Sequence, residues 1–238
     1  MEEWLQRTIL LLGKESTDLL RRQRILIVGV GGVGAYAAEM LVRAGIGNLT
    51  IIDSDSVAAS NINRQLVALH STIGQQKVDI LAERLRDISP TAHIEACRLY
   101  LEADGVEALL SSGYDFVVDA IDTVAPKVAL LTACRQNKIP VISSMGAGAR
   151  LDPTKIRYAD IADTSYCGLA RAVRSRLRKE GIQRGIPVVF STETPRSEAV
   201  TETSGERNKR TTVGTVSYMP AIFGCYLAAY VIRKLTRQ

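Results

Sequence analysis

Residues 25–65 read ILIVGVGGVGAYAAEMLVRAGIGNLTIIDSDSVAASNINRQ. Their first four residues, Ile25–Val28, form a mostly β-branched apolar run, which is typical of a buried strand. Four glycines follow: Gly29, Gly31, Gly32 and Gly34. The first, second and fourth of them fit the pattern G-x-G-x-x-G. In this pattern the first glycine permits a tight turn, the second lets a phosphate approach the backbone, and the third lets the helix pack closely on the strand. The stretch therefore predicts a nucleotide-binding strand, turn and helix.

The next elements extend this unit. A helix is predicted over residues 32–44, and its first N–H groups would favour an anion at that end. Asp53 follows the next predicted strand, Leu49–Ile52, and an acidic side chain there can accept hydrogen bonds from ribose hydroxyls. To this point the sequence suits an NAD-dependent oxidoreductase equally well. The simplest alternative is a glycine-rich turn that binds nothing.

A dense polar cluster separates these alternatives. Residues 61–65 read Asn-Ile-Asn-Arg-Gln, and an oxidoreductase has no need of such a cluster. ATP, in contrast, needs cations near its β and γ phosphates. Arg64 can supply a forked guanidinium, and Lys77, at the start of the next predicted helix, can supply a point charge. The cluster therefore favours a triphosphate.

A second acidic segment ends a further predicted strand, Asp115–Val118. It reads Asp-Ala-Ile-Asp, from Asp119 to Asp122. Because parallel strands end at one edge of a sheet, a carboxylate here can hold Mg²⁺ against phosphates. Each such residue alone could cap a helix or lie in solvent. Their occurrence at successive strand ends favours an ATP site.

Residues 7–150 resemble the adenylating domain of the ubiquitin-activating enzyme superfamily. Bacterial members of that superfamily activate sulfur-carrier proteins for thiamine and molybdopterin synthesis. The matching segments are GVGGVG at 29–34, DSD at 53–55, NINRQ at 61–65, Lys77 and DAID at 119–122. The resemblance implies adenylation of a carboxylate by ATP, with release of pyrophosphate.

The resemblance also implies roles for single residues. Asp53 would bind the ribose, Arg64 and Lys77 would bind the triphosphate as catalytic residues, and Asp122 would coordinate Mg²⁺ as the essential carboxylate. Arg64 would reach in from the other subunit of a homodimer, and Arg7 resembles a second such arginine. Further residues expected at the ATP site are Gly29, Gly31, Gly32, Gly34, Asp55, Asn61, Asn63, Gln65 and Asp119. A monovalent cation near the nucleotide and an assisting cysteine desulfurase system are left open.

The cysteines separate branches of the superfamily. They are Cys97, Cys134, Cys167 and Cys225, with no C-x-x-C pair. The sulfur-carrier activators characteristically hold zinc with two such pairs, and that site cannot be assembled here. We expect Cys97, Cys134 and Cys225 in the core, and Cys167 is the only candidate for an exposed thiol, although a buried helix-start residue is the simpler interpretation.

The rest of the chain alternates helices and strands. Helices are predicted over 76–88, 102–111, 125–137 and 167–180, and strands over 93–98, 115–118 and 140–144, with an antiparallel strand at 156–159. This alternation predicts an α/β fold, Rossmann-like and doubly wound, with a mostly parallel sheet, an antiparallel extension and a C-terminal helix. The 238 residues suit one adenylating domain, with a nucleotide-binding core at about 22–150 and a substrate-facing extension at about 151–238.

Two segments in the second half of the chain are informative about membrane association and about the substrate. Thr211–Ile232 is uncharged, but its dense apolar part starts only at Met219, so a buried helix from about Pro220 is favoured over membrane association. No signal segment begins the chain, which predicts a cytoplasmic location. Residues 191–210 are polar and predict a long loop, and the resemblance implies that this loop lies over the substrate.

The chain concentrates its positive charge in one predicted helix. Residues 171–184 hold six basic residues against one acid, Glu180, a net charge of +5 that equals the charge of the whole chain. A solvated helix face is the simplest explanation, but such concentration favours a polyanion such as tRNA. The residues expected to contact tRNA are Arg171, Arg174, Arg176, Arg178 and Lys179.

The missing zinc cysteines, the basic helix and the segment ISSMGAGARLDPTKIRYADIADT at 142–164 resemble one branch of the superfamily, which dehydrates threonylcarbamoyladenosine in tRNA. The resemblance implies that ATP adenylates the threonylcarbamoyl carboxylate, after which the neighbouring carbamoyl group closes a ring and expels AMP. Three alternatives stay open: a sulfur-carrier adenylyltransferase, an NAD-dependent oxidoreductase, and a tRNA-binding protein without catalysis.

Overall fold

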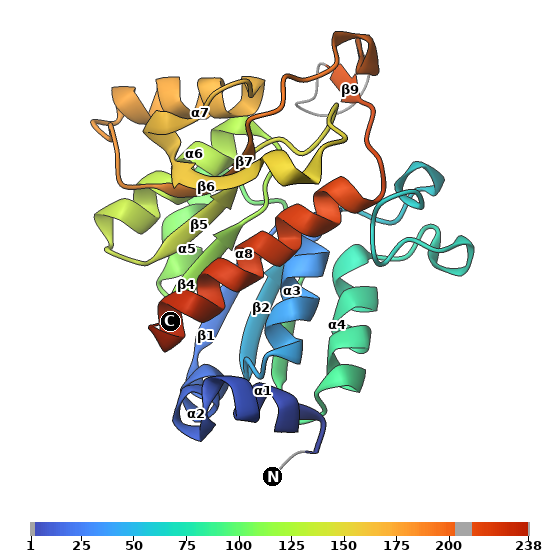
Figure 1. The fold of residues 1–238 in the computed structure, drawn as a ribbon, viewed down its shortest axis with the longest axis vertical. Coiled ribbons are helices and arrows are strands. Elements are labelled where there is room, and N and C mark those ends of the chain that lie inside the picture. Colours follow the sequence, from blue (N-terminus) through green and yellow to red (C-terminus); the bar gives the residue numbers. More distant parts are fainter. Residues whose placement is uncertain (1–2, 203–210, 238) are drawn as a thin grey trace.

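A seven-stranded sheet organises the computed structural model, which describes residues 3–202 and 211–237 (Figure 1). The strand order is β3-β2-β1-β4-β5-β7-β6, and all neighbours are parallel except the antiparallel pair β6 and β7. The strands are β1 Arg24–Val28, β2 Asn48–Ile52, β3 His93–Cys97, β4 Phe116–Asp119, β5 Val141–Ser144, β6 Ile156–Asp160 and β7 Pro187–Ser191. The predicted mostly parallel sheet with an antiparallel extension is confirmed.

Helices cover both faces of this sheet. They are α1 Gln6–Leu12, α2 Lys14–Arg22, α3 Gly34–Arg43, α4 Lys77–Ile88, α5 Val106–Leu110, α6 Val124–Gln136, α7 Gly168–Lys179 and α8 Tyr218–Thr236. Residues of α2, α3, α4 and α8 share one buried cluster with the sheet, and residues of α5, α6 and α7 share the other. The doubly wound architecture is therefore confirmed.

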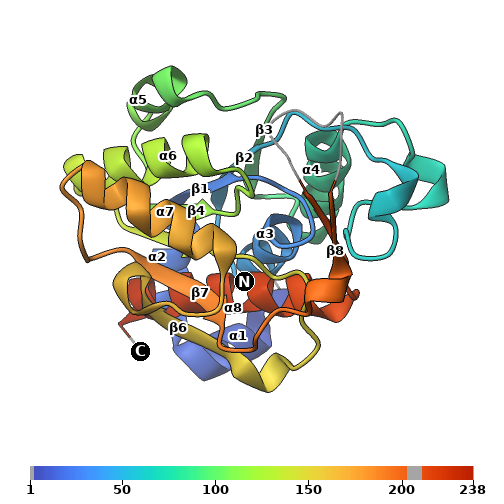
Figure 2. The same cartoon turned by 90° about the horizontal axis from the view of Figure 1, so that it is seen from above.

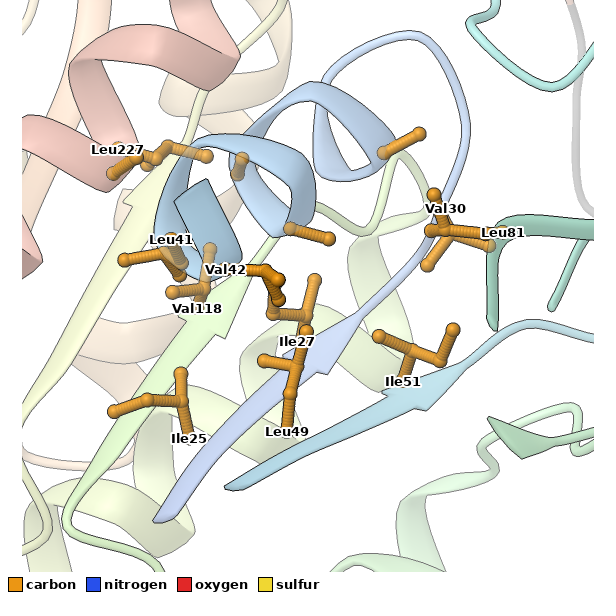
Figure 3. Close-up of a cluster of buried hydrophobic side chains, with 14 of the residues drawn as sticks. Ile25, Ile27, Val30, Leu41, Val42, Leu49, Ile51, Leu81, Val118 and Leu227 are labelled. Atoms are coloured by element: carbon orange, nitrogen blue, oxygen red, sulfur yellow. The ribbon is translucent and has the colours of Figure 1, made fainter. Parts of the chain in front are cut away.

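Side-chain alternation along β1 explains the two layers. Ile25 and Ile27 pack into the cluster of α3 and α8, whereas Leu26 and Val28 pack into the cluster of α6 and α7. Successive residues of a strand face opposite sides of the sheet, so a continuous apolar strand implies two covered faces. Figure 3 shows the first cluster, with Leu227 of α8 beside the helix α3.

The C-terminal helix α8 is a core element, as its apolar sequence predicted. It lies across α3, and Gly224 marks the contact: a Cβ atom there would lie 2.4 Å from Val33 O and 2.8 Å from Tyr36 Cβ. Within the described residues, no helix is long and apolar enough to cross a membrane.

Two expectations from the sequence need correction. Residues 191–210 were expected to form one long loop, but Ser191 closes β7, and the short strands β8 Val200–Glu202 and β9 Thr211–Val213 pair antiparallel. The rest of that segment, 203–210, lies outside the described residues. Seen from above, the pair of β8 and β9 lies to the right of the view and α7 to the left (Figure 2). The cysteine assignments were also wrong in part, because Cys225 is exposed; Cys167 is buried, as the simpler interpretation held.

The α3–α8 contact predicts a stability effect. Gly224→Ala should lower the free energy of unfolding by about 1–3 kcal/mol, because the new methyl group overpacks the helix crossing. Gly168→Ala in α7 is the control, since a Cβ there meets nothing within 4 Å. Urea denaturation measures both variants. Equal stability of Gly224→Ala and the parent would contradict the close packing described here.

Candidate functional site

The glycine-rich turn lies at the carboxyl edge of the sheet, between β1 and α3. Gly29 has φ +89°, and a Cβ atom there would lie 2.8 Å from Ala120 O. A Cβ atom at Gly34 would lie 1.8 Å from Gly29 O. Glycine is therefore required at both positions, at the first for the turn and close approach and at the last for helix packing, as the pattern predicted.

The middle of this turn presents unpaired donors. Within the described residues, the backbone N–H groups of Gly31, Gly32 and Val33 have no hydrogen-bond acceptor. They precede α3, whose N-terminus adds a partial positive charge. Such a set of N–H groups can bind a phosphate.

Asp53, which follows β2, braces the turn from one side. Its Oδ2 accepts a 2.8 Å hydrogen bond from Val30 N–H, and its Oδ1 accepts one of 2.9 Å from Asp55 N–H. Burial raises the pKa of the Asp53 carboxyl above its usual value, and the charge of Lys77 opposes that shift. Asp53 thus holds the turn in place, and its role toward a ribose stays a prediction.

Lys77 begins α4 and points toward the same edge. Its side chain is 5% exposed, and Nζ lies 2.7 Å from Oδ2 of the exposed Asp55. The lysine cation is therefore fixed beside the glycine-rich turn by a partner that faces solvent.

The polar cluster at 61–65 packs directly against the glycine-rich turn. Arg64 Cγ and Gln65 Nε2 would lie 3.5 and 3.8 Å from Cβ atoms placed at Gly32 and Gly31. Gln65 is buried, and its Oε1 has no partner among the described residues. Arg64 therefore lies at the turn of its own chain, and the expectation that it arrives from another subunit is wrong.

The two asparagines of this cluster shape its loop. Asn61 Oδ1 accepts a 3.1 Å hydrogen bond from Ala58 N–H, and Asn63 Nδ2 donates one of 2.9 Å to Thr215 O, just before α8. Arg64 Nη1 donates to Ser60 O and Asn63 Oδ1, both at 2.8 Å. The loop is thereby tied to the start of α8.

The two aspartates after β4 have different surroundings. Asp119 was expected at the ATP site, but it is the last residue of β4, fully buried, and paired with Lys127 of α6 at 2.8 Å. Asp122 is exposed at the carboxyl edge, where a nucleotide can reach it. Sequence reasoning missed Lys127; its signal is a lone cation between apolar residues of a buried helix.

The loop that follows β5 frames the edge next to Asp122. Arg150, 4% exposed, donates hydrogen bonds to the carbonyl oxygens of Gly146, Gly148, Tyr166 and Glu193.

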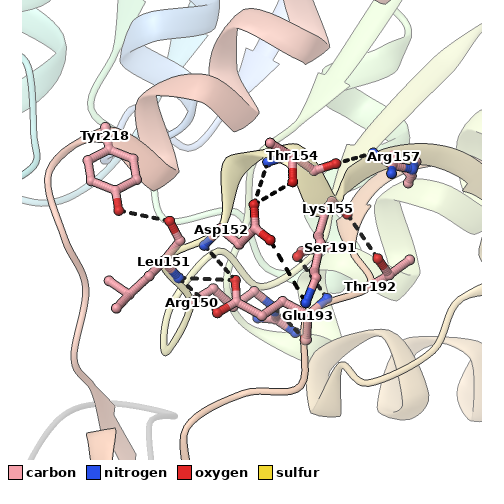
Figure 4. A network of polar contacts seen from close by, with 10 residues as sticks. All are labelled: Arg150, Leu151, Asp152, Thr154, Lys155, Arg157, Ser191, Thr192, Glu193 and Tyr218. Carbon is pink, nitrogen blue, oxygen red and sulfur yellow. Dashed lines mark hydrogen bonds and ion pairs between the residues drawn. The ribbon is translucent and has the colours of Figure 1, made fainter.

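The Glu193 carboxylate in turn accepts the N–H groups of Leu151 and Asp152, and Tyr218 OH donates to Leu151 O (Figure 4). This network fixes the loop between β7 and the start of α8. The sequence pattern singled out the segment 142–164, but it did not predict that Arg150 lies at the centre of this network.

Arg7 lies far from this edge in its own chain. It is an exposed residue of α1, which lies with α2 at the end of the molecule where β1 begins, opposite the glycine-rich turn (Figure 1). Leu10 and Leu11 of the same helix are 80% and 83% exposed. Arg7 could therefore reach a nucleotide only in another copy of the chain.

The basic helix α7 is confirmed, and it buries Val173 and Leu177. Four of its five cations expected to contact tRNA are exposed: Arg171, Arg176, Arg178 and Lys179. Arg174 is different, because its Nη1 donates to Thr164 Oγ1 at 2.5 Å, Thr164 O at 3.1 Å and Ile161 O at 3.4 Å. Arg174 is half-buried and holds the preceding loop through Nη1, and its contact with tRNA stays a prediction.

Comparison with known proteins agrees with this geometry. The model of the ThiF family matches residues 5–238. The tRNA threonylcarbamoyladenosine dehydratase of Bacillus subtilis is 37% identical, over 98% of this chain and 94% of the relative. Crystal structures of the Escherichia coli tRNA N6-threonylcarbamoyladenosine dehydratase in complex with AMP and with ATP each give a TM-score of 0.89 at 36% identity, over 100% of this chain and 96% of that chain.

A relative from the sulfur-carrier branch matches less of the chain. The molybdopterin-synthase adenylyltransferase of E. coli is 36% identical, but over only 61% of this chain and 58% of the relative. The dehydratases match both the nucleotide-binding core and the half that carries the basic helix. The chain therefore belongs to the ThiF family, and within it to the tRNA threonylcarbamoyladenosine dehydratases.

Proposed function

We propose that this protein is an enzyme that uses ATP to dehydrate threonylcarbamoyladenosine in tRNA. The observation that carries the proposal is the meeting, at one edge of the sheet, of the unpaired N–H groups of residues 31–33, the cations of Arg64 and Lys77, and the carboxylate of Asp122. The near full-length similarity to dehydratases, including one crystallised with ATP and AMP, supports the substrate.

The nucleotide would lie over the glycine-rich turn. The N–H groups of Gly31 and Gly32 would hold a phosphate, and Asp53, already bonded to the turn, would keep one carboxylate face for the ribose. Arg64 and Lys77 would neutralise the outer phosphates. Lys77 would then bind a phosphate in place of its present partner, the exposed Asp55. Because a phosphate would take the place of the Asp55 carboxylate, the buried lysine cation would stay paired throughout.

Mg²⁺ fits the donors of this site. Within the described residues no group of three or more His, Cys, Asp or Glu side chains could hold a metal by itself. Mg²⁺ commonly uses one or two carboxylates together with substrate phosphates, and Asp122 is an exposed carboxylate at this edge. When bound, Mg²⁺ would neutralise phosphate charge, and Asp122 would hold it.

The reaction divides into two displacements. In the first, a carboxylate oxygen of the threonylcarbamoyl group attacks the α phosphorus of ATP and pyrophosphate leaves. In the second, the carbamoyl group of the same side chain attacks the acyl-adenylate, and AMP leaves as the ring closes. Because the nucleophile is already attached to the electrophile, the enzyme needs only to orient the groups and neutralise charge.

A sulfur-carrier adenylyltransferase is the second candidate, since the nucleotide-binding half would serve either reaction. The dispersed cysteines and the partial match to such an enzyme weigh against it. The exposed cations of α7 weigh for a polyanionic substrate. We propose a cytoplasmic location, which a tRNA-modifying role supports.

We further propose that the 238 residues act as one adenylating domain within a homodimer. Leu10 and Leu11 form an exposed apolar patch on α1, and such patches mark interfaces. A partner bound there would carry the neighbouring Arg7 to the site of the other copy, as a cross-subunit arginine.

The dehydration itself is directly measurable. Incubation with ATP, Mg²⁺ and tRNA bearing threonylcarbamoyladenosine should remove one water from that nucleoside, as read by nucleoside mass analysis. Asp122→Ala should slow this turnover by about 100-fold or more, since it removes charge stabilisation at the reacting phosphate, and should leave tRNA binding intact. Loss of tRNA binding in this variant would show that its role has been misassigned. An unchanged nucleoside with the wild-type enzyme would contradict the proposed reaction.

The basic helix should bind tRNA through phosphates. Replacing Arg171 and Arg178 by Glu should weaken tRNA binding and lower the slope of log affinity against log salt by about 2. Filter binding at several salt concentrations measures both effects. The control replaces Arg22 and Lys138 by Glu, which changes net charge equally at exposed positions outside α7. If tRNA affinity falls equally in the two variants, the cations of α7 are simply a solvated helix face.

The cross-subunit role of Arg7 can be tested by mixing inactive variants. Arg7→Ala and Asp122→Ala should each be inactive alone. Random exchange of subunits creates mixed dimers with one complete site, so an equal mixture should regain about a quarter of wild-type activity. Activity that stays absent after demonstrated subunit exchange would show that Arg7 acts within its own chain or not at all.

A further inference from the structure

A buried ion pair lies directly behind the turn that carries Asp122. The side chains of Lys127 and Asp119 are both 0% exposed, and Lys127 Nζ lies 2.8 Å from Asp119 Oδ2. The same ammonium group donates a 2.8 Å hydrogen bond to Ile121 O. Asp119 also accepts Ile121 N–H at 3.0 Å and Ser143 Oγ–H at 2.6 Å. Both backbone polar groups of Ile121 are therefore held by one pair of buried charges.

Stability alone does not explain these charges. Removing two ions from water costs several kcal/mol each, and well-packed apolar residues often replace a buried pair without loss. A pair that grips the N–H and the C=O of one residue does, however, impose a single conformation on the turn. The feature that this pair specifies is the path of the backbone from Asp119 to Asp122.

The backbone path from Asp119 to Asp122 matters because it contacts the glycine-rich turn and also carries Asp122. Ala120 O would lie 2.8 Å from a Cβ atom at Gly29, and Ala120 Cβ would lie 3.2 Å from one at Gly34. Ala120 is thus pressed against the glycine-rich turn, and Asp122 is the first residue after the gripped Ile121. A shift of this turn would move the Asp122 carboxylate relative to the N–H groups that face the phosphates.

On the basis of the proposed function, we propose that Lys127 is a positioning residue for the adenylation step, which acts through Ile121 to place Asp122. Lys127 touches no substrate. Its ammonium group holds the carbonyl of Ile121 inward, while Asp119 holds the N–H of the same residue. The reaction therefore depends on a lysine that is hidden from the nucleotide.

The test replaces both charges together, so that neither is left buried and unpaired. The double variant Asp119→Asn/Lys127→Met should fold and bind ATP with nearly wild-type affinity in calorimetry. Its kcat for tRNA-dependent AMP release should fall by about 100-fold, because misplaced catalytic groups cost that much. Hydrogen exchange at the Ile121 amide should accelerate. Leu130 is a buried residue of the same helix, and Leu130→Ala is the control for destabilised packing. Assayed at a temperature well below its Tm, this control should have the wild-type kcat.

The outcomes separate positioning from a purely structural role. A folded double variant with wild-type kcat would overturn the proposal, and so would a loss of ATP affinity that accounts for the whole loss of kcat/KM. If the double variant does not fold, Lys127→Arg serves instead, because it keeps both charges paired while it displaces the donor to Ile121 O. A lower kcat at unchanged KM for ATP supports the proposal, and an unchanged kcat overturns it. If the wild-type enzyme forms no AMP, the proposed function fails, whereas unchanged exchange at Ile121 would refute the positioning itself.

Discussion

The contact between the glycine-rich turn and the turn after β4 is the constraint on which the rest of the site depends. Gly29 approaches Ala120 so closely that any side chain at position 29 would collide with the Ala120 carbonyl oxygen. Because β1 and β4 are parallel neighbours, both turns leave the sheet at the same edge. The contact therefore brings the unpaired N–H groups, which we propose bind phosphate, to the same edge as the Asp122 carboxylate, although about ninety residues separate them in the chain.

The charges around that contact fall into two classes. Lys127 and Asp119 are fully buried and neutralise each other, so they set conformation. Lys77 is buried too, but its partner Asp55 faces solvent, so a phosphate could replace Asp55 and keep this cation paired. An adenylating site needs both classes, since a triphosphate must be neutralised while the reacting groups stay fixed.

Periodicity and glycine spacing were enough to predict the sheet, the layers and the glycine-rich turn, because these depend on local pattern. Burial of single polar residues was not predictable in that way. Asp119 and Asp122 look alike in the sequence, but β4 extends one residue further than the pattern indicated and carries Asp119 into the core. Cys225 was misplaced for a related reason, since its exposure depends on which face of α8 meets α3.

Because the burial of single polar residues could not be predicted, the surface proposed to contact tRNA is smaller than the sequence indicated. Arg174 and Arg178 are four residues apart in α7, so helical spacing groups them on one face. Arg174 folds back onto the loop before α7, whereas Arg171 and Arg178, two turns apart, remain exposed. They lie about 10 Å apart along the helix, and as exposed cations they would contact phosphates, which position a nucleic acid without reading its sequence. The loop held by Arg150 follows β5, the parallel neighbour of β4, so it leaves the sheet at the same edge as Asp122 and is the candidate surface for the modified nucleoside.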